Sequence, residues 1–169
     1  MTIFRRTVWY RCQACARALA VYERWATTQV DEAFLAALPH DVGRVALATR
    51  FGVSAPAVGD TDSSDDGSLS MADHAEVGAY LLGLWGFSDS IVEAIAFHNA
   101  PSRVSEPVGL TAVVHAADFL VSRSDPAHAE PERPMLEEGF LDLPEVSARW
   151  KGWTALWPGP SVGGPEVKA

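Results

Sequence analysis

Five ionisable side chains occupy positions that helical spacing turns toward the interior of this chain. His40 and Asp41 are neighbours in "ALPHDVGRVAL", within a stripe of apolar residues at helical spacing. His74, His98 and Asp118 each lie on the apolar face of a later helical segment. Imidazole nitrogens and carboxylate oxygens are ligands that divalent metal ions prefer. The sequence therefore predicts one polar centre, gathered from segments far apart in the chain.

Two interpretations of this centre stay open from the residues alone. A single buried histidine on an apolar face is more often a core residue with its hydrogen bonds satisfied than a ligand. Burying unpaired imidazole and carboxylate groups in four separate segments is costly, whereas together these groups satisfy one another. They form either a metal site or an internal hydrogen-bond network without metal.

Helical periodicity dominates the segments that carry these residues, and no segment alternates apolar and polar residues convincingly over the length of a strand. Asp31 is the expected N-cap of the second segment, and Gly52 and Gly86 are expected to end the third and the fourth. The expected helices cover about 7–26, 31–38, 41–51, 72–85, 88–99 and 107–122. The predicted fold class is all-α, a compact bundle of about six helices.

The chain is expected to contain one folded domain followed by a less regular C-terminal part. The predicted divisions are a helical domain over 1–124 with an acidic loop at 53–71, an irregular extension over 125–157 with a short helix near 145–151, and a disordered tail over 158–169. Trp150, Trp153 and Trp157 are predicted either to fold back over the core or to form an oligomeric interface.

Composition narrows the class of protein. The 169 residues are 48% hydrophobic, which suffices for one domain with a sizeable core. A formal net charge of −9 and a pI of about 4.9 argue against a basic surface for nucleic acid. No apolar run approaches the ~20 residues of a membrane span, and no signal-peptide core follows the first residues. We therefore expect a cytoplasmic protein that binds neither nucleic acid nor membrane.

Cys12 and Cys15 form the pair "CQAC", which has the spacing of some zinc and redox motifs. A zinc site requires two more ligands nearby, and a redox pair requires a helix that follows a strand. The pair instead lies in an Ala-rich helical stretch, "RCQACARALAVYERWA". We interpret both cysteines as small buried side chains.

Three stretches resemble a known superfamily. "AFLAALPHDVGRVALA", "DHAEVGAYLLGLWGFSDSIVEAIAFHNAP" and "VVHAADFL" are similar, in this order, to the HDOD signalling domain. That domain is a relative of the HD-GYP cyclic-dinucleotide phosphodiesterases in the HD superfamily of metal-dependent phosphohydrolases. The resemblance covers about residues 9–122. It implies a helical HD-like fold with a two-metal site, in which His40, Asp41 and Asp118 surround one ion and Asp41 bridges to a second ion held by His74 and His98.

Departures from the family pattern indicate a degenerate site. The family's first ligand, a histidine on the opening helix, falls near Arg11, and a permanent cation repels a metal ion. The second histidine of the phosphodiesterase His-His pair is Asn99 here, a weak neutral ligand. No Gly-Tyr-Pro signature follows the His-Asp segment, and the half of the HDOD domain that precedes Trp9 has no counterpart. We expect either a shortened member of the family or a sequence whose N-terminal part was lost. Without that half, the first helices would expose an apolar patch that favours oligomerisation or the docking of a partner.

The expected function is that of a non-catalytic regulatory domain of the HDOD type, with little or no bound metal. Arg11 then acts as the counter-charge of Asp41 and Asp118, or it binds a phosphate-bearing ligand. The alternative is a metal-dependent phosphohydrolase acting on a nucleotide or a cyclic dinucleotide, with Fe, Mn, Mg or Zn at the site. The expected partner is a signalling protein or a second copy of the chain. His115 and His128 are expected outside the centre, His115 off the inward stripe.

Overall fold

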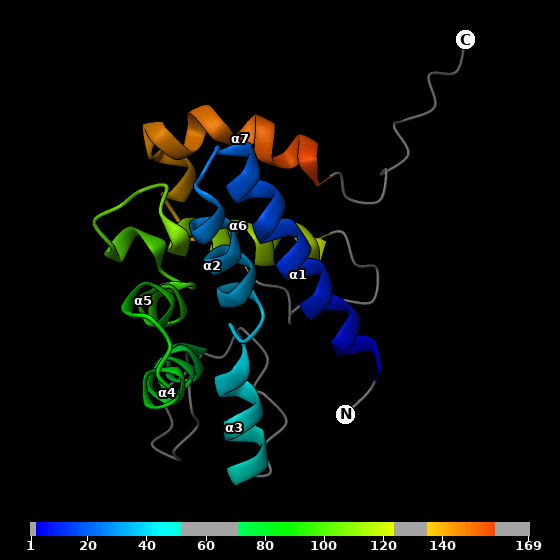
Figure 1. Ribbon diagram of the computed structural model, residues 1–169, viewed down its shortest axis with the longest axis vertical. Coiled ribbons are helices and arrows are strands. Elements are labelled where there is room, and N and C mark those ends of the chain that lie inside the picture. Colours follow the sequence, from blue (N-terminus) through cyan, green and yellow to red (C-terminus); the bar gives the residue numbers. More distant parts are fainter. Residues whose placement is uncertain (1–2, 52–70, 124–134, 158–169) are drawn as a thin grey trace.

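The computed structural model of the chain describes residues 3–51, 71–123 and 135–157 (Figure 1). Over these ranges the chain forms seven α-helices and two short 3-10 turns, and no strand. The helices are α1 (Ile3–Tyr22), α2 (Thr27–Ala37), α3 (Val42–Phe51), α4 (Met71–Leu84), α5 (Asp89–Phe97), α6 (Leu110–Arg123) and α7 (Pro144–Leu156), with turns η1 (Pro101–Arg103) and η2 (Phe140–Asp142). The predicted all-α class is confirmed. Predictions on loop residues 53–70, Gly52, His128 and the tail 158–169 fall outside the described residues.

Small side chains shape the contact between the first two helices. Cys15, Ala16 and Ala20 on α1 are fully buried, and the alanines of α2 pack against them. Arg24 has a φ of 58°, a left-handed conformation that reverses the chain after α1, which therefore ends before the predicted residue 26. α2 begins four residues earlier than expected, so Asp31 lies inside the helix and is not its N-cap.

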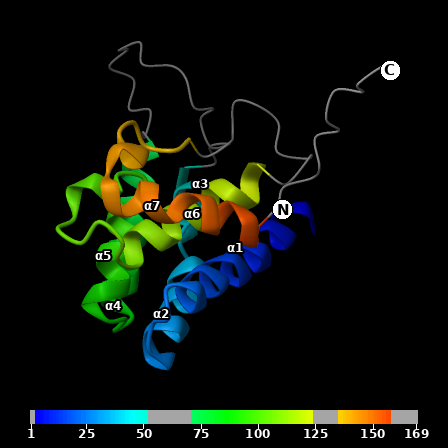
Figure 2. The ribbon, with the colours of Figure 1, turned by 90° about the horizontal axis from the view of Figure 1, so that it is seen from above.

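α6 runs through the middle of the structure, between the other helices (Figures 1 and 2). Eleven of its fourteen residues are buried, because α1, α2 and α5 pack around it. A larger apolar core joins α1, α2, α6 and α7, and a smaller one joins α2, α4, α5 and α6. Burial of nearly the whole helix places any polar side chain of α6 in the interior.

Glycine positions fix how α3 and α4 meet and where α4 ends. A Cβ at Gly43 would collide with the carbonyl oxygen of His74, so only glycine permits this close approach of α3 and α4. Gly86 has a φ of 79° and follows the end of α4, as the sequence predicted. The α3–α4 contact therefore holds His74 close to the start of α3.

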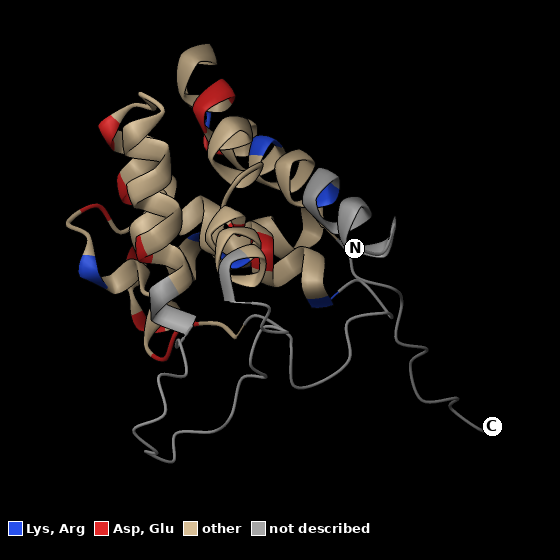
Figure 3. Ribbon diagram, turned by 90° about the horizontal axis from the view of Figure 1, so that it is seen from below, with Lys and Arg blue, Asp and Glu red and all other residues tan. Residues whose placement is uncertain are grey.

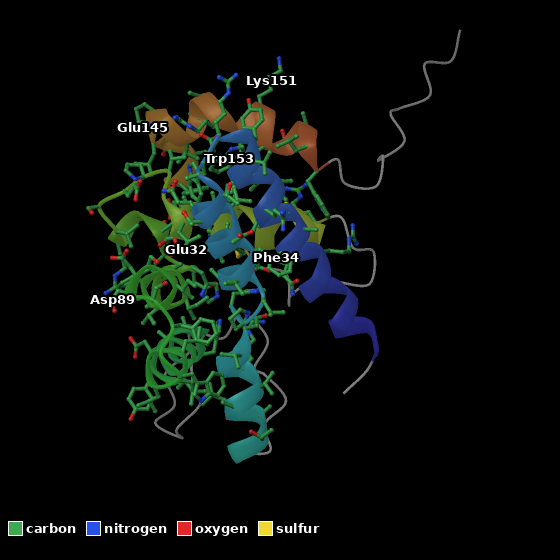
Figure 4. All side chains as sticks on the ribbon, in the orientation of Figure 1. Glu32, Phe34, Asp89, Glu145, Lys151 and Trp153 are labelled. Atoms are coloured by element: carbon green, nitrogen blue, oxygen red, sulfur yellow. The ribbon has the colours of Figure 1, made fainter. Side chains whose placement is uncertain are left out.

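The C-terminal segment is more regular than expected. α7 spans thirteen residues, whereas the sequence indicated only a short helix in an irregular extension. Trp153 is fully buried, and its side chain lies where α7 passes over α1 (Figure 4). Its indole Nε1–H donates a hydrogen bond of 2.8 Å to Glu23 Oε1. Of the two fates predicted for the tryptophans, folding back over the core applies to Trp153.

Charged residues are distributed over many elements. Blue Lys and Arg positions lie apart from one another on different helices of the described part, with acidic positions between them (Figure 3). None of the described helices combines the length and the apolar character that crossing a membrane requires.

Candidate functional site

The five predicted centre residues come from four places in the fold. His40 and Asp41 lie in the tight turn between α2 and α3, not within one helical stripe. The Val42 N–H donates to the Pro39 carbonyl at 2.7 Å and closes this turn. His74 lies on α4, His98 directly follows α5 as its C-cap residue, and Asp118 lies on α6.

The structure brings all five side chains together. His40 Nε2 lies 3.3 Å from Asp118 Oδ1 and 3.7 Å from Asp41 Oδ2. His74 Nε2 lies 3.6 Å from Asp41 Oδ1 and 3.4 Å from His98 Nε2. These contacts form one continuous cluster, which we call the His-Asp cluster. The sequence predicted this convergence from the inward phase of His74, His98 and Asp118 and from the cost of burying each polar group alone, although residues 40 and 118 are far apart in the sequence.

The two residues predicted to line the site have different positions. Asn99 Nδ2 lies 3.3 Å from His74 Nε2 and therefore belongs to the edge of the cluster. The Arg11 guanidinium lies 5.8 Å from the centre of the Trp157 ring. Arg44 is a cation in contact with the cluster, because its Nε lies 3.0 Å from Asp41 Oδ1. Sequence reasoning did not single out Arg44, although it follows Asp41 by three residues.

Cys12 is a further site residue that sequence reasoning missed. Its Sγ, one nitrogen of His40 and one oxygen of Asp118 all lie within 4.8 Å of one another. Asp41, His74 and His98 form a second such group. Cys12 directly follows Arg11, at the place where the family resemblance puts its first ligand. That adjacency was the available signal, but both cysteines of the C-x-x-C pair were interpreted as small buried side chains.

Backbone carbonyls orient two of the imidazoles. His40 Nδ1–H donates to the Ala37 carbonyl at 2.9 Å, and His98 Nδ1–H donates to the Ile95 carbonyl at 2.7 Å. Each bond leaves Nε2 turned toward the cluster. Metal-binding histidines have the same arrangement, because the hydrogen bond fixes the ring and its tautomer.

The histidines differ in their affinity for protons. Burial lowers the pKa of His74 to about 3, and the Arg44 guanidinium adds to this effect. Burial likewise lowers the pKa of His98 to about 4. Burial also disfavours protonation of His40, but the carboxylates of Asp41 and Asp118 outweigh it and raise the pKa of His40 to about 9. His74 and His98 are therefore neutral at pH 7, as metal ligands must be.

The two carboxylates stay ionised. Burial acts to raise the pKa of Asp41 and of Asp118, but the neighbouring His40 lowers both, and Arg44 lowers that of Asp41 further. His40 Nε2 is fully buried and has no hydrogen-bond partner among the described residues. Two carboxylates and the neutral imidazoles of His74 and His98 fit a divalent cation, which would also take the place of the proton on His40 Nε2.

His115 supports the cluster from behind. It is buried, contrary to the expectation that it lies off the inward face of its helix. Its Nδ1–H donates to the His98 carbonyl at 2.7 Å, and its Nε2 accepts a hydrogen bond of 3.1 Å from the Glu137 N–H. His115 thus ties the end of α5 to the segment that precedes η2, without joining the cluster itself.

The family model of the HDOD domain matches residues 2–101 of the chain. This range contains Cys12, the His-Asp turn, His74, His98 and Asn99, whereas Asp118 on α6 lies beyond it. Comparisons with curated proteins and with solved structures gave no match.

Proposed function

Because this chain belongs to the HDOD domain family, we propose that it is a regulatory signal-transduction domain and not a hydrolase. In this proposal the His-Asp cluster positions the helices around it and does not turn over a substrate. The same domain is expected to pass a signal to a protein partner or to a second copy of the chain. Large apolar side chains exposed at the end of α4, namely Tyr80, Leu84 and Trp85, support a protein contact.

Burial of the cluster is the observation that carries this proposal. His40 and His98 are each 1% exposed, His74 is 3% exposed and Asp118 is 7% exposed, whereas the side chain of Asp41 is 20% exposed. A phosphohydrolase must bring a phosphate ester and an attacking water to its ligands. Four of the five side chains are covered by protein atoms and do not offer that access, whereas a structural or sensing centre does not need it.

The position of Arg44 supports the same conclusion. The family resemblance assigns Asp41 as the carboxylate that bridges two ions. In the structure a guanidinium nitrogen lies 3.0 Å from Asp41 Oδ1. A permanent cation at this oxygen repels a metal ion and already neutralises the carboxylate. Two-metal hydrolysis would require Asp41 to hold both ions against this charge.

A metal-dependent phosphohydrolase acting on a nucleotide or a cyclic dinucleotide is the second candidate. The separation of the donors into two groups of three favours it, because two adjacent ion sites are what a two-metal centre requires. Bound divalent ions would lower the pKa of a water molecule there. Asp41 would orient the site, and His74 and His98 would supply neutral nitrogens.

A turnover assay separates the two candidates. The purified chain is supplemented in turn with manganese, iron and zinc and is incubated with linear and cyclic dinucleotides and with a chromogenic phosphodiester. We expect the wild type to hydrolyse these substrates no faster than the variant Asp41→Ala. Asp31→Ala, which removes an exposed carboxylate away from the cluster, is the matched control. Hydrolysis that Asp41→Ala abolishes and Asp31→Ala retains would overturn the regulatory proposal and establish the phosphohydrolase.

A further inference from the structure

We infer that Cys12 is a metal ligand, and that Cys12, His40 and Asp118 with Asp41 bind a divalent ion of the zinc class. The inference goes beyond the regulatory function, because it concerns which ion the chain binds and by which atoms. It also differs from the sequence expectation of little or no bound metal. That expectation depended on Arg11 at the first ligand position, whereas the structure turns Cys12 toward the cluster.

Three separate elements supply the donor atoms. Cys12 comes from the middle of α1, His40 from the turn after α2, and Asp118 from the middle of α6. The exposed fractions of these three side chains are at most 10%. Because α1 and α6 are packed against each other along the larger core, the donors are held in place before any ligand binds. Preorganised donors on packed helices favour tight binding of an ion.

The orientation of His40 is the second, independent observation. Its Nδ1–H is engaged by the Ala37 carbonyl at 2.9 Å, so Nε2 is directed into the group and can bind an ion there once it has lost its proton. This nitrogen is buried and has no hydrogen-bond partner in the described part of the chain. Leaving such an atom unsatisfied is costly in a protein interior. A cation placed among Cys12, His40 and Asp118 satisfies it.

The ligand types select the ion. Thiolate sulfur is a soft donor that suits zinc and similar ions, whereas magnesium and manganese prefer sites made of oxygen. Asp41 Oδ2 lies 3.7 Å from His40 Nε2 and is placed to supply a fourth donor. One sulfur, one nitrogen and two carboxylate oxygens complete the four ligands of a zinc site. Binding requires the Cys12 thiol and His40 Nε2 each to release a proton to solvent, so affinity rises with pH.

Cobalt and zinc titrations of the full chain test this inference, with Cys12→Ser compared with the matched variant Cys15→Ser. Cys15 is equally buried and lies three residues along the same helix. We expect the wild type to bind one equivalent of zinc and, with cobalt, to show the sulfur-to-cobalt charge-transfer absorption. Cys12→Ser should lose this absorption and bind zinc about 100-fold or more weakly. A residue that binds the ion directly contributes at least as much to its affinity as a residue that only supports a ligand. Cys15→Ser should retain both properties.

Circular dichroism in chelator shows whether each variant folds. If Cys12→Ser does not fold, the wild type is alkylated in mild urea with and without zinc, and mass spectrometry identifies which cysteine is modified. Zinc should protect Cys12 from alkylation more than Cys15. A wild type without the sulfur-to-cobalt absorption, or an absorption that depends on Cys15, would overturn the inference. Either result leaves the regulatory proposal intact, whereas turnover in the phosphodiester assay would overturn that proposal and leave the zinc site standing.

Discussion

His40 and His98 are both fully buried, yet their protonation differs. Two carboxylates face His40 and raise its pKa to about 9, whereas burial lowers the pKa of His98 to about 4. The helical phase of the sequence predicted that these side chains turn inward. It contained no information on which charges face each ring, because those charges arrive from other segments. The protonation states therefore follow only from the three-dimensional arrangement.

Cys12 and Arg44 show the same limit at single positions. Both lie within a few residues of predicted site residues, but neither was assigned to the centre. A cysteine in an Ala-rich helix has the pattern of a packing residue, and an arginine after a His-Asp pair has the pattern of a solvated charge. Their roles depend on the angles at which α1 and α3 pass the cluster, which sequence spacing does not determine.

The first prediction concerns pH and the metal-free protein. Its free energy of unfolding should be greatest near pH 6.5. The pKa of His40 is raised from 6.5 to about 9, so its contribution is present below pH 6.5 and is lost as the pH rises through 9. The pKa values of His74 and His98 are lowered to about 3 and about 4, so stability also falls as the pH drops below 6.5. Urea unfolding in chelator measures this profile, and a rise from pH 6.5 to 9 would contradict it.

The second prediction concerns Arg44→Gln. Removing the guanidinium 3.0 Å from Asp41 Oδ1 should strengthen binding of divalent ions by about fivefold or more, because a like charge a few ångströms away costs about 1 kcal/mol or more. Isothermal titration with zinc measures the change. Arg17→Gln, which removes a cation from an exposed pair with Asp31 at 3.9 Å, should leave affinity unchanged. Equal or weaker binding by Arg44→Gln would show that Arg44 does not compete with the ion.

At the scale of elements, the sequence predicted six helices at the right places. The errors lie at the boundaries and at the C-terminus. α1 ends early because Arg24 adopts a left-handed conformation, which no residue preference for arginine indicates. α7 is longer than expected because Trp153 and Val146 are fully buried against the other helices. Tertiary packing, not local propensity, stabilises that helix.

Gly43 provides the third prediction, at the contact between α3 and α4. Gly43→Ala should destabilise the protein by about 2–3 kcal/mol, because the added methyl group meets the backbone of His74 and forces the helices apart. Gly83→Ala is the control: nothing lies within 4 Å of its Cβ, so it should stabilise α4 by about 0.5–1 kcal/mol. Thermal unfolding compares the two, and equal stabilities would mean that the helices do not approach at Gly43.

At the scale of the whole molecule, one acidic residue joins the two ends of the described chain. Glu23, at the end of α1, accepts hydrogen bonds of 2.7 Å from Arg149 Nε and 2.8 Å from Trp153 Nε1. Both donors lie on α7. The docking of α7 covers the larger core, which also contains Cys12. Residues far beyond the 2–101 family match therefore complete the fold around the cluster.

The fourth prediction follows from this junction. Glu23→Gln should lower the free energy of unfolding by about 1–3 kcal/mol, because it removes a charged acceptor from two donors, one of them fully buried. Glu138→Gln alters an exposed position and should change stability by less than about 0.5 kcal/mol. Urea denaturation quantifies both variants. A Glu23→Gln protein as stable as the wild type would mean that apolar contacts alone dock α7.

The convergence of four separate segments on one buried His-Asp cluster is tested most directly by the proton affinities of its histidines. Side-chain NMR of the metal-free protein follows each imidazole through a pH titration. The structure predicts that His40 titrates near pH 9, while His74 and His98 stay neutral down to about pH 4. If all three titrate near pH 6.5, as isolated solvent-exposed histidines do, the side chains do not meet and the cluster does not exist.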